Sequence, residues 1–334
     1  MSTLRLFSGM QPSADSLHLG NYAGALTQWV SMQSAYEAIF CVVDLHAITV
    51  PQNPEMLSAN TLKTAAQYIA CGIDPEKSTL FVQSHVAAHA KLAWILNTIT
   101  SFGEASRMTQ FKDKSIRHGA ENATVGLFTY PVLQAADILL YGSEVVPVGE
   151  DQRQHVELTR NLAERFNQKF GTVLKIPEAR IIDAAAKIYD LQNPSSKMSK
   201  SGQSPQGVIW LLDEPEVIRK KIMSSVTDAG STVRFEPEKK PGISNLMSLA
   251  SVATGNPLSL VEEEFGGFGY GDFKSSVADS VIELVLPIQK RTLELLDDPA
   301  ELSRILGEGA EKAQNIANET LKRVEDAVGL LPRI

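Results

Sequence analysis

The stretch Leu4-Arg5-Leu6-Phe7-Ser8-Gly9 decides how the chain begins to fold. Its first five residues alternate in character before the glycine, which predicts a short β-strand that ends there. Residues 11–16 have the composition of a turn, and Ser16 or Asp15 can cap a helix that runs from about 17 to 33. Free backbone N–H groups and the helix dipole both attract phosphate at such a helix N-terminus. The opening stretch is therefore a strand, a turn and a helix N-terminus in the order that suits an anion site.

Two residues at that helix tip are candidates for the phosphate site. Gly20 leaves room for a close ligand, and His18 provides a donor beside it. Each also has a simpler explanation, which is close helix packing for Gly20 and a surface position for His18. From this stretch alone the simpler explanations are preferred, so the phosphate site needs support from elsewhere in the chain.

Further strands alternate with helices along the sequence. Residues 38–43 form an unbroken apolar run, typical of a strand covered on both faces, and the polar residues Asp44 and His46 follow it. Strands are also predicted at 78–83 and 145–149, and helices at 54–70, 87–100, 131–141 and 150–170. Segment 181–191 is expected to return to the sheet. This alternation predicts a doubly wound parallel sheet, in which ligands bind beyond the carboxyl ends of the strands.

The sequence changes in character at two places. A polar and basic segment at 102–119 breaks the alternation, and we interpret it as the start of an insertion that spans about 102–170. After about Gly207 the predicted elements are all helices, at 215–226, 244–254, 258–265, 273–296 and 299–328. We therefore expect a Rossmann-like domain over residues 1–207 and an all-helical C-terminal domain over residues 208–334.

The second stretch with clear chemistry is Lys197-Met198-Ser199-Lys200-Ser201. Pro194 before it and Gly202 and Pro205 after it disfavour a regular element, which predicts an exposed, hinged loop. Two ammonium groups three residues apart on such a loop can close on one polyanion. A solvated basic loop is the simpler alternative, but a phosphate site at the first helix would give these lysines a ligand.

Composition is that of an ordinary globular enzyme. Of the 334 residues, 43% are apolar and 21% are charged. Nothing approaches the roughly 18 consecutive apolar residues of a membrane span, and neither a signal peptide nor a transit segment is visible. Cys41 and Cys71 stand in no paired motif, so we expect a reduced, cytoplasmic protein without disulfides or structural zinc. The net charge of −8 argues against diffuse binding to DNA, but it leaves open a structured RNA docked through local patches.

Two other features have competing explanations. Asp137 lies in an otherwise apolar predicted helix, where a carboxylate is costly unless it is paired. From the residues alone, an ion pair with a nearby arginine or lysine is the preferred explanation. His85 and His89 have the spacing of metal ligands on one helix face, but no third ligand is apparent. A position at the start of a helix or on the surface is therefore preferred for both histidines.

The stretch at the start of the chain and the lysine stretch at 197–201 belong to a longer set of motifs that follow one another along the whole chain. They are Phe7-Ser8-Gly9-Met10-Gln11-Pro12-Ser13, His18-Leu19-Gly20-Asn21-Tyr22, Val43-Asp44 with His46-Ala47-Ile48-Thr49, Arg107-Met108-Thr109-Gln110-Phe111-Lys112, Ala135-Ala136-Asp137-Ile138-Leu139, Val148-Gly149-Glu150-Asp151-Gln152, Lys197 to Ser201, and Pro241-Gly242-Ile243-Ser244-Asn245. In this order and spacing they resemble the class I aminoacyl-tRNA synthetases, and most closely the short bacterial or organellar tryptophanyl-tRNA synthetases.

The resemblance implies roles for individual residues. ATP would be bound by Gln11, Pro12, Ser13, His18, Gly20, Asn21, Gly149, Glu150, Asp151, Ile188, Lys197, Met198, Ser199, Lys200 and Ser201. The catalytic residues would be His18, Lys114, Lys197 and Lys200, with the lysines neutralising the pyrophosphate leaving group. Tryptophan would be bound by Asp137, Phe7, His46 and Gln134. Asp137 would accept the indole N–H, which agrees with the chemistry, because indole offers one donor and no acceptor.

The implied reaction is the ATP-dependent activation of L-tryptophan to tryptophanyl-adenylate, followed by transfer to tRNA(Trp). The substrate carboxylate is itself the nucleophile, so catalysis is alignment plus stabilisation of charge on the phosphates. The resemblance also implies Mg²⁺ bound through the ATP phosphates rather than by protein side chains, and a homodimer with contacts from the insertion. The helical domain over residues 208–334 would bind the anticodon.

Two residues depart from the family pattern, and three alternatives remain open. Gly202 replaces a common aspartate after the lysine motif, and Gln134 replaces a common methionine in the pocket. The alternatives are a tyrosyl-tRNA synthetase, a non-catalytic synthetase paralogue and a small-molecule adenylyltransferase. Against the first stand Phe7, Asn21, the turn at 149–152 and the lack of a C-terminal RNA-binding appendage. Against the second stand Lys197 and Lys200, and the third leaves the helical half without a role.

Overall fold

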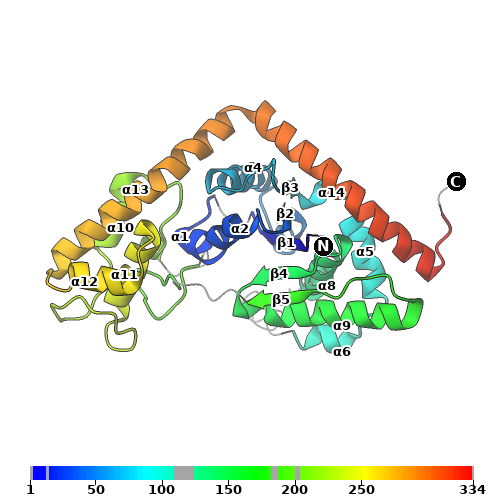
Figure 1. The fold of residues 1–334 in the computed structure, drawn as a ribbon, viewed down its shortest axis with the longest axis horizontal. Coiled ribbons are helices and arrows are strands. Elements are labelled where there is room, and N and C mark those ends of the chain that lie inside the picture. The colour runs from blue at the N-terminus through cyan, green and yellow to red at the C-terminus, as the bar shows by residue number, and fades with distance from the viewer. Residues whose placement is uncertain (1–2, 13–14, 109–123, 182–186, 200–203, 333–334) are drawn as a thin grey trace.

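The centre of the fold is a parallel β-sheet with the strand order β3-β2-β1-β4-β5 (Figure 1). The computed structural model describes residues 3–12, 15–108, 124–181, 187–199 and 204–332. Every pairing between neighbouring strands of the sheet is parallel. The strands are β1 Arg5–Met10, β2 Glu37–Val42, β3 Thr79–Val82, β4 Val145–Val148 and β5 Glu178–Ile181. The predicted doubly wound parallel sheet is therefore confirmed.

Alternate side chains of the strands enter two separate cores, one on each face of the sheet. Leu6 and Phe40 belong to the core beneath helix α4 (Pro54–Ala70). Their chain neighbours Phe7 and Ile39 belong to the core beneath α5 (Ala88–Asn97), α8 (Val125–Leu140) and α9 (Arg153–Phe170). Side chains that point alternately to the two faces follow from the pleat of a strand. Because helices cover both faces, both sets must be apolar, which explains the unbroken apolar run predicted at 38–43.

Helices cover the sheet from both sides, and helices α10 to α13 from the C-terminal part of the chain form a further cluster beside it, here called the C-terminal cluster (Figure 1). Among the described residues up to 181, the helices are α1 Leu19–Asn21, α2 Thr27–Met32, α3 Asp44–Ala47, α4 Pro54–Ala70, α5 Ala88–Asn97, α6 Phe102–Ser106, α8 Val125–Leu140 and α9 Arg153–Phe170. Short turns of other helical types are η1 Tyr22–Leu26, η2 Gln83–His85, η4 Glu150–Gln152 and η5 Pro205–Gly207. The later helices are α10 Pro215–Met223, α11 Pro241–Thr254, α12 Leu258–Phe265, α13 Tyr270–Asp297 and α14 Pro299–Val328.

The first helical segment has a different cap from the predicted one. His18 is its N-cap, and the imidazole accepts a hydrogen bond from the backbone N–H of Asn21, while the Asn21 side chain accepts one from the backbone N–H of His18. Ser16 cannot serve as the cap, because its hydroxyl donates to the Leu17 carbonyl and accepts from Gln67. The prediction that Ser16 or Asp15 caps this helix is therefore wrong.

Two other predicted boundaries are shifted. Helix α8 begins at Val125 rather than Pro131, because the Thr124 hydroxyl accepts a hydrogen bond from the Leu127 N–H and caps the helix there. The proline lies inside the helix instead of at its start. Strand β5 ends at Ile181, so the return to the sheet precedes the predicted segment 181–191, of which residues 182–186 lie outside the described ranges.

The last helix returns from the C-terminal cluster to the sheet (Figure 1). Helix α14 packs against the edge strand β3 and against α5 and α8. Gly309 makes this crossing possible, since a Cβ atom at that position would lie 1.7 Å from the carbonyl oxygen of Leu80. The proposed boundary near residue 207 between a catalytic and a helical domain stays a prediction. None of the described helices combines the length and the apolar composition that a bilayer crossing requires.

Candidate active site

A cavity of about 500 Å³ opens at the carboxyl end of the sheet. Its walls include the end of β1 from Phe7 to Met10 and the end of β4 from Val146 to Gly149. Strand order reverses between these two neighbours, because β2 and β3 follow on one side of β1 and β4 and β5 on the other. Open α/β sheets bind ligands at this switch point. The cavity is therefore where the fold predicts a ligand site.

The tip of the first helix and the lysine loop meet at this cavity. His18, Gly20 and Asn21 line it together with residues 197–199. A Cβ atom on Gly20 would lie 3.0 Å from the His18 Nδ1 and 3.5 Å from the Cβ of Met198, which shows how closely the two segments approach. The helix tip and the described residues of the lysine stretch therefore lie together, as predicted, whereas phosphate binding there stays a prediction.

The proton arrangement of His18 follows from its capping role. Its Nδ1 accepts the Asn21 backbone N–H at 3.2 Å, so in the neutral ring the proton is on Nε2. The Nε2–H group is a donor suited to a phosphate oxygen. The ring also packs edge-on against Trp210 at 5.9 Å between centroids, and His18 is buried. The imidazole is therefore held in one orientation by both its neighbours and its cap.

Backbone hydrogen bonds anchor the start of the lysine loop. The Met198 N–H donates to the Ile188 carbonyl at 3.0 Å, and the Asp190 carboxylate accepts the N–H groups of Gln192 and Asn193. Met198 is buried, whereas Lys197 is exposed. The loop thus inserts its apolar residue beside the first helix and keeps an ammonium group in solvent at the cavity rim.

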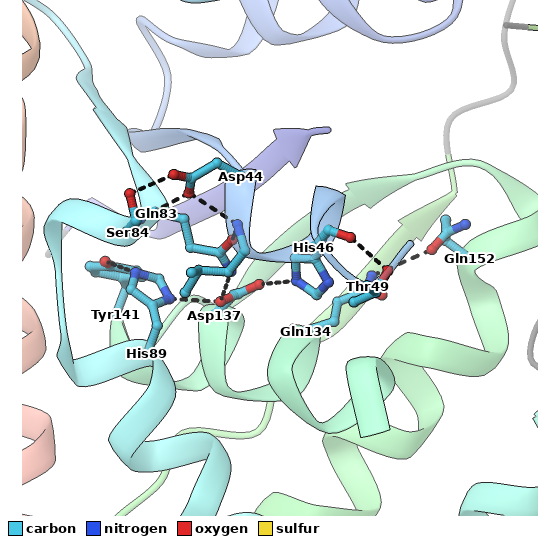
Figure 2. A network of polar contacts seen from close by, with 11 residues as sticks. Asp44, His46, Thr49, Gln83, Ser84, His89, Gln134, Asp137, Tyr141 and Gln152 are labelled. Carbon is cyan, nitrogen blue, oxygen red and sulfur yellow. Dashed lines mark hydrogen bonds and ion pairs between the residues drawn. The ribbon is translucent and has the colours of Figure 1, made fainter. Parts of the chain in front are cut away.

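Asp137 is at the centre of a buried polar network behind the cavity (Figure 2). Its Oδ2 lies 2.7 Å from His46 Nε2, and its Oδ1 lies 2.6 Å from His89 Nδ1 and 2.7 Å from Gln83 Nε2. The expected ion pair with an arginine or lysine is therefore wrong. His89 lies at the start of α5, as one of the two preferred positions predicted, but it is fully buried, so the alternative surface position is wrong.

The network keeps Asp137 ionised. Burial alone would raise the pKa of this carboxyl, but His46 and then His89 reverse the effect and hold its pKa well below the usual range. An ionised carboxylate is an acceptor only, so the three neighbours donate to it. Among the described residues no group of three or more histidine, cysteine, aspartate or glutamate side chains is arranged to hold a metal ion.

Phe7 and Gln134 form two further walls of the cavity. The Phe7 ring stacks on Tyr141 with 5.4 Å between centroids and an 8° interplanar angle. Gln134 donates to the side chain of Gln152 at 3.4 Å (Figure 2). Gln152 in turn donates to Asp151 at 2.9 Å. The cavity thus has an aromatic and a polar side chain in its lining, which suits a ligand with both a planar ring and polar groups.

The structure brings most of the predicted site residues to this cavity. Those that line it are Phe7, Gln11, His18, Gly20, Asn21, His46, Gln134, Asp137, Gly149, Asp151, Lys197, Met198 and Ser199. Pro12 and Ile188 are buried and do not line it. Glu150 points into solvent and pairs with Arg153 at 2.7 Å, an interaction that lowers the pKa of Glu150. Ser13, Lys114, Lys200 and Ser201 lie outside the described residues.

Sequence reasoning missed several residues of the site. Gln83, His89 and Tyr141 support Asp137 from outside the cavity, and Gln152 and Tyr130 line it. The available signal was positional, because Gln83 follows β3 just as His46 follows β2, at the same edge of the sheet. His89 carried a second signal, since it is a polar residue among the apolar positions of its helix.

Comparisons with known proteins agree with this geometry. The family model described as "tRNA synthetases class I (W and Y)" matches residues 1–285. A tryptophan–tRNA ligase of Leifsonia xyli is 60% identical over 327 residues, which cover 98% of this chain and 97% of that protein. The tryptophan–tRNA ligase of Mycobacterium leprae is 55% identical over 333 residues, with 98% and 97% of the two chains covered.

Two experimental structures have the same fold over almost their whole length. The tryptophanyl-tRNA synthetase of Mycoplasma pneumoniae superimposes with a TM-score of 0.90 at 34% identity, and the alignment covers 99% of each chain. The Campylobacter jejuni enzyme, crystallised with ADP and tryptophan, has a TM-score of 0.83 at 36% identity, with 98% of this chain and 100% of that chain covered. The chain therefore belongs to the class I tRNA synthetases for tryptophan and tyrosine, and within them to the tryptophanyl-tRNA synthetases.

Proposed function

We propose that this chain joins L-tryptophan to tRNA(Trp) in two steps. ATP first activates the amino acid to tryptophanyl-adenylate with release of diphosphate, and the tryptophanyl group then passes to the tRNA with release of AMP. Support comes from the family and from relatives named as tryptophan–tRNA ligases. The single observation that carries the proposal is one cavity that holds a phosphate-type helix tip, a lysine-bearing loop and a buried, ionised carboxylate.

Asp137 supports tryptophan as the amino acid. A carboxylate has about four lone-pair sites, and the described residues occupy three of those on Asp137. One acceptor site therefore remains for a ligand with one donor, which is what an indole ring offers. Phe7, stacked on Tyr141, provides an aromatic wall for the same ring.

The helix tip and the lysine loop support ATP as the co-substrate. His18 and the dipole at the start of the helix would attract the phosphates, and Lys197, which lines the same cavity, would approach them from the lysine loop. Lys200 and Lys114 are proposed to join them, and Asp151 and Gly149 would bind the ribose side. The lysines act by stabilising the charge that develops on the leaving diphosphate.

Mg²⁺ is proposed to be bound mainly by the phosphate oxygens of ATP. Such an ion keeps several waters and uses at most one or two protein carboxylates, so it requires no dedicated cluster of acidic residues. Asp151 is the exposed carboxylate on the cavity wall and fits that limited role. The ion would neutralise phosphate charge, and alignment of the reacting atoms would remain the task of the side chains.

A homodimer is proposed, with contacts from the insertion at about 102–170. Three large apolar side chains on or beside this segment are strongly exposed, with 72% of Trp94 and 78% of both Phe102 and Val125 accessible. Exposed apolar patches of this kind mark interaction surfaces. Sedimentation of the wild type and of Phe102→Glu tests the proposal, with a dimer expected for the former and a weakened dimer for the latter.

The helical C-terminal region is proposed to bind the anticodon, and the cytoplasmic location stays a prediction.

One assay separates the proposed function from its alternatives. Exchange of labelled pyrophosphate into ATP is measured with tryptophan, with tyrosine and with no amino acid. The proposal predicts exchange with tryptophan alone, followed by charging of tRNA(Trp). Exchange with tyrosine would indicate a tyrosyl-tRNA synthetase. Exchange without an amino acid would indicate a different adenylyltransferase, and none under any condition would indicate a non-catalytic paralogue.

A further inference from the structure

The two carboxylate oxygens of Asp137 have different surroundings. Oδ2 contacts His46, which lines the cavity. Oδ1 contacts Gln83 and His89, neither of which is among the residues that line the cavity. One oxygen therefore faces the ligand space, and the other faces the protein interior between β3 and α5 (Figure 2).

Both interior donors are fixed by further hydrogen bonds. His89 Nδ1 must carry the proton that it donates to the ionised Asp137, and in the neutral ring its Nε2 then accepts from the Tyr141 hydroxyl at 2.7 Å. The Gln83 side-chain oxygen accepts the Leu45 backbone N–H at 3.1 Å, which turns the amide NH₂ toward Asp137. His89 and Gln83 are fully buried. Neither side chain can therefore exchange its contact with Asp137 for a contact with water.

Rotation of the Asp137 carboxylate would change the chemistry of the pocket. With Oδ1 held by two donors, only Oδ2 can accept a further hydrogen bond, and His46 already occupies one of its two lone-pair sites. Without the interior donors the carboxylate could rotate or take up a proton. A protonated carboxyl would present an O–H donor, which repels an indole N–H instead of accepting it.

We propose that His89 and Gln83 determine amino-acid specificity as positioning residues, by holding Oδ1 of Asp137 so that Oδ2 offers one acceptor site to an aromatic ring with a single N–H donor. The inference rests on the proposed function and deepens it. A ring of the same shape without the N–H leaves this acceptor unpaired in a buried site, and sites built around one hydrogen bond reject such analogues strongly. Tyr141 acts one step further away, by fixing the proton on His89 Nδ1.

The test compares L-tryptophan with 3-benzothienyl-L-alanine, in which sulfur replaces the ring N–H. Pyrophosphate exchange gives kcat/KM for each amino acid, and the ratio of the two values measures discrimination. We expect His89→Ala to lower this ratio by about ten- to hundredfold, the effect of losing one hydrogen bond to a charged group. The loss should come from tryptophan, with the values for the sulfur analogue and the KM for ATP close to those of the wild type. His85→Ala is the matched control, because His85 is exposed and lies four residues away.

Two further variants separate positioning from folding. His89→Asn keeps a donor near the position of Nδ1 and is expected to restore most of the discrimination. Tyr141→Phe removes only the hydroxyl and is expected to lower the ratio less than His89→Ala does. If His89→Ala fails to fold, Gln83→Leu replaces it with the same expectation. An unchanged ratio in His89→Ala or its replacement, or equal losses with both amino acids, would overturn the inference. Failure of the proposed function is a separate result, since the wild type would then show no exchange with tryptophan.

Discussion

Asp137→Asn is the substitution whose consequences follow most directly from the structure. The change keeps the size of the side chain but removes the charge that receives three hydrogen bonds. Hydrogen bonds to a charged group contribute about 1.5–3 kcal/mol each to stability. The asparagine side chain keeps one acceptor oxygen, but its NH₂ group is itself a donor and cannot accept from the neighbours that donate to the second carboxylate oxygen. Removal of one partner from a buried charged set costs about 3–5 kcal/mol. We expect the free energy of unfolding to fall by that amount at pH 7.

The pH dependence of this loss has a definite sign. Because the pKa of Asp137 is lowered by folding, its stabilising effect is fully present above the ordinary aspartate pKa of about 3.9 and disappears as the pH falls toward the folded value. The difference in stability between wild type and variant should therefore be constant from pH 7 to about pH 5 and shrink below about pH 4.

Urea denaturation followed by circular dichroism at several pH values measures both quantities. Asp44→Asn is the matched control, since Asp44 is only partly buried and accepts from the neutral groups of Leu45 and Ser84. It should lose much less stability than Asp137→Asn. Equal stability of wild type and Asp137→Asn at pH 7, or a difference that grows on acidification, would refute the account of the buried network.

Three other substitutions test separate parts of the structure. Gly309→Ala should lower the free energy of unfolding by at least about 1–3 kcal/mol, because the added Cβ would meet the Leu80 carbonyl. Gly307→Ala is the control, because its added Cβ meets no other atom. Its higher helix propensity should raise the free energy of unfolding by up to about 1 kcal/mol in the same urea titration. Lys200→Ala should lower the rate of adenylate formation in stopped-flow measurements far more than it weakens tryptophan binding, and equal losses would contradict the role given to the lysine loop. Lys221→Ala should lower the free energy of unfolding by about 3–5 kcal/mol in a urea titration, because it leaves the Asp213 carboxylate, 2.6 Å away, without its buried partner. An unchanged free energy of unfolding would contradict the stabilising role of this ion pair.

The sheet could be predicted from the sequence because its signals are local. The run from Ala38 to Val43 is apolar at every position, and the structure places alternate members of it in the two cores. The predicted bounds of α4 and α14 agree with the structure, because each helix begins at a proline, which is favoured at the first position of a helix.

The same local rules failed where tertiary contacts decide the outcome. Ser16 is a stronger helix cap than histidine by propensity, but its hydroxyl is engaged by Gln67, 51 residues later in the chain. Pro131 resembled the first residue of a helix, yet Thr124 provides an earlier cap. Neither competing interaction can be recognised in the sequence next to the residue that it affects.

Asp137 shows the same limit in the candidate site. Its position on an apolar helix marked it as unusual, but its partners His46 and His89 are 91 and 48 residues away in the chain. The sequence therefore predicted a carboxylate that needs a partner and named the wrong class of partner. The roles of Lys200 and Lys114 stay predictions, because both residues lie outside the described ranges.

The most direct test of the account is a crystal structure of the protein with L-tryptophan and a non-hydrolysable ATP analogue. We expect the indole N–H within hydrogen-bond distance of Asp137 Oδ2, with Oδ1 still bound by Gln83 and His89. The phosphates should lie between the helix tip at His18 and the loop that begins at Lys197. An indole ring bound away from Asp137, or phosphates in contact with neither of these two segments, would contradict the central claim.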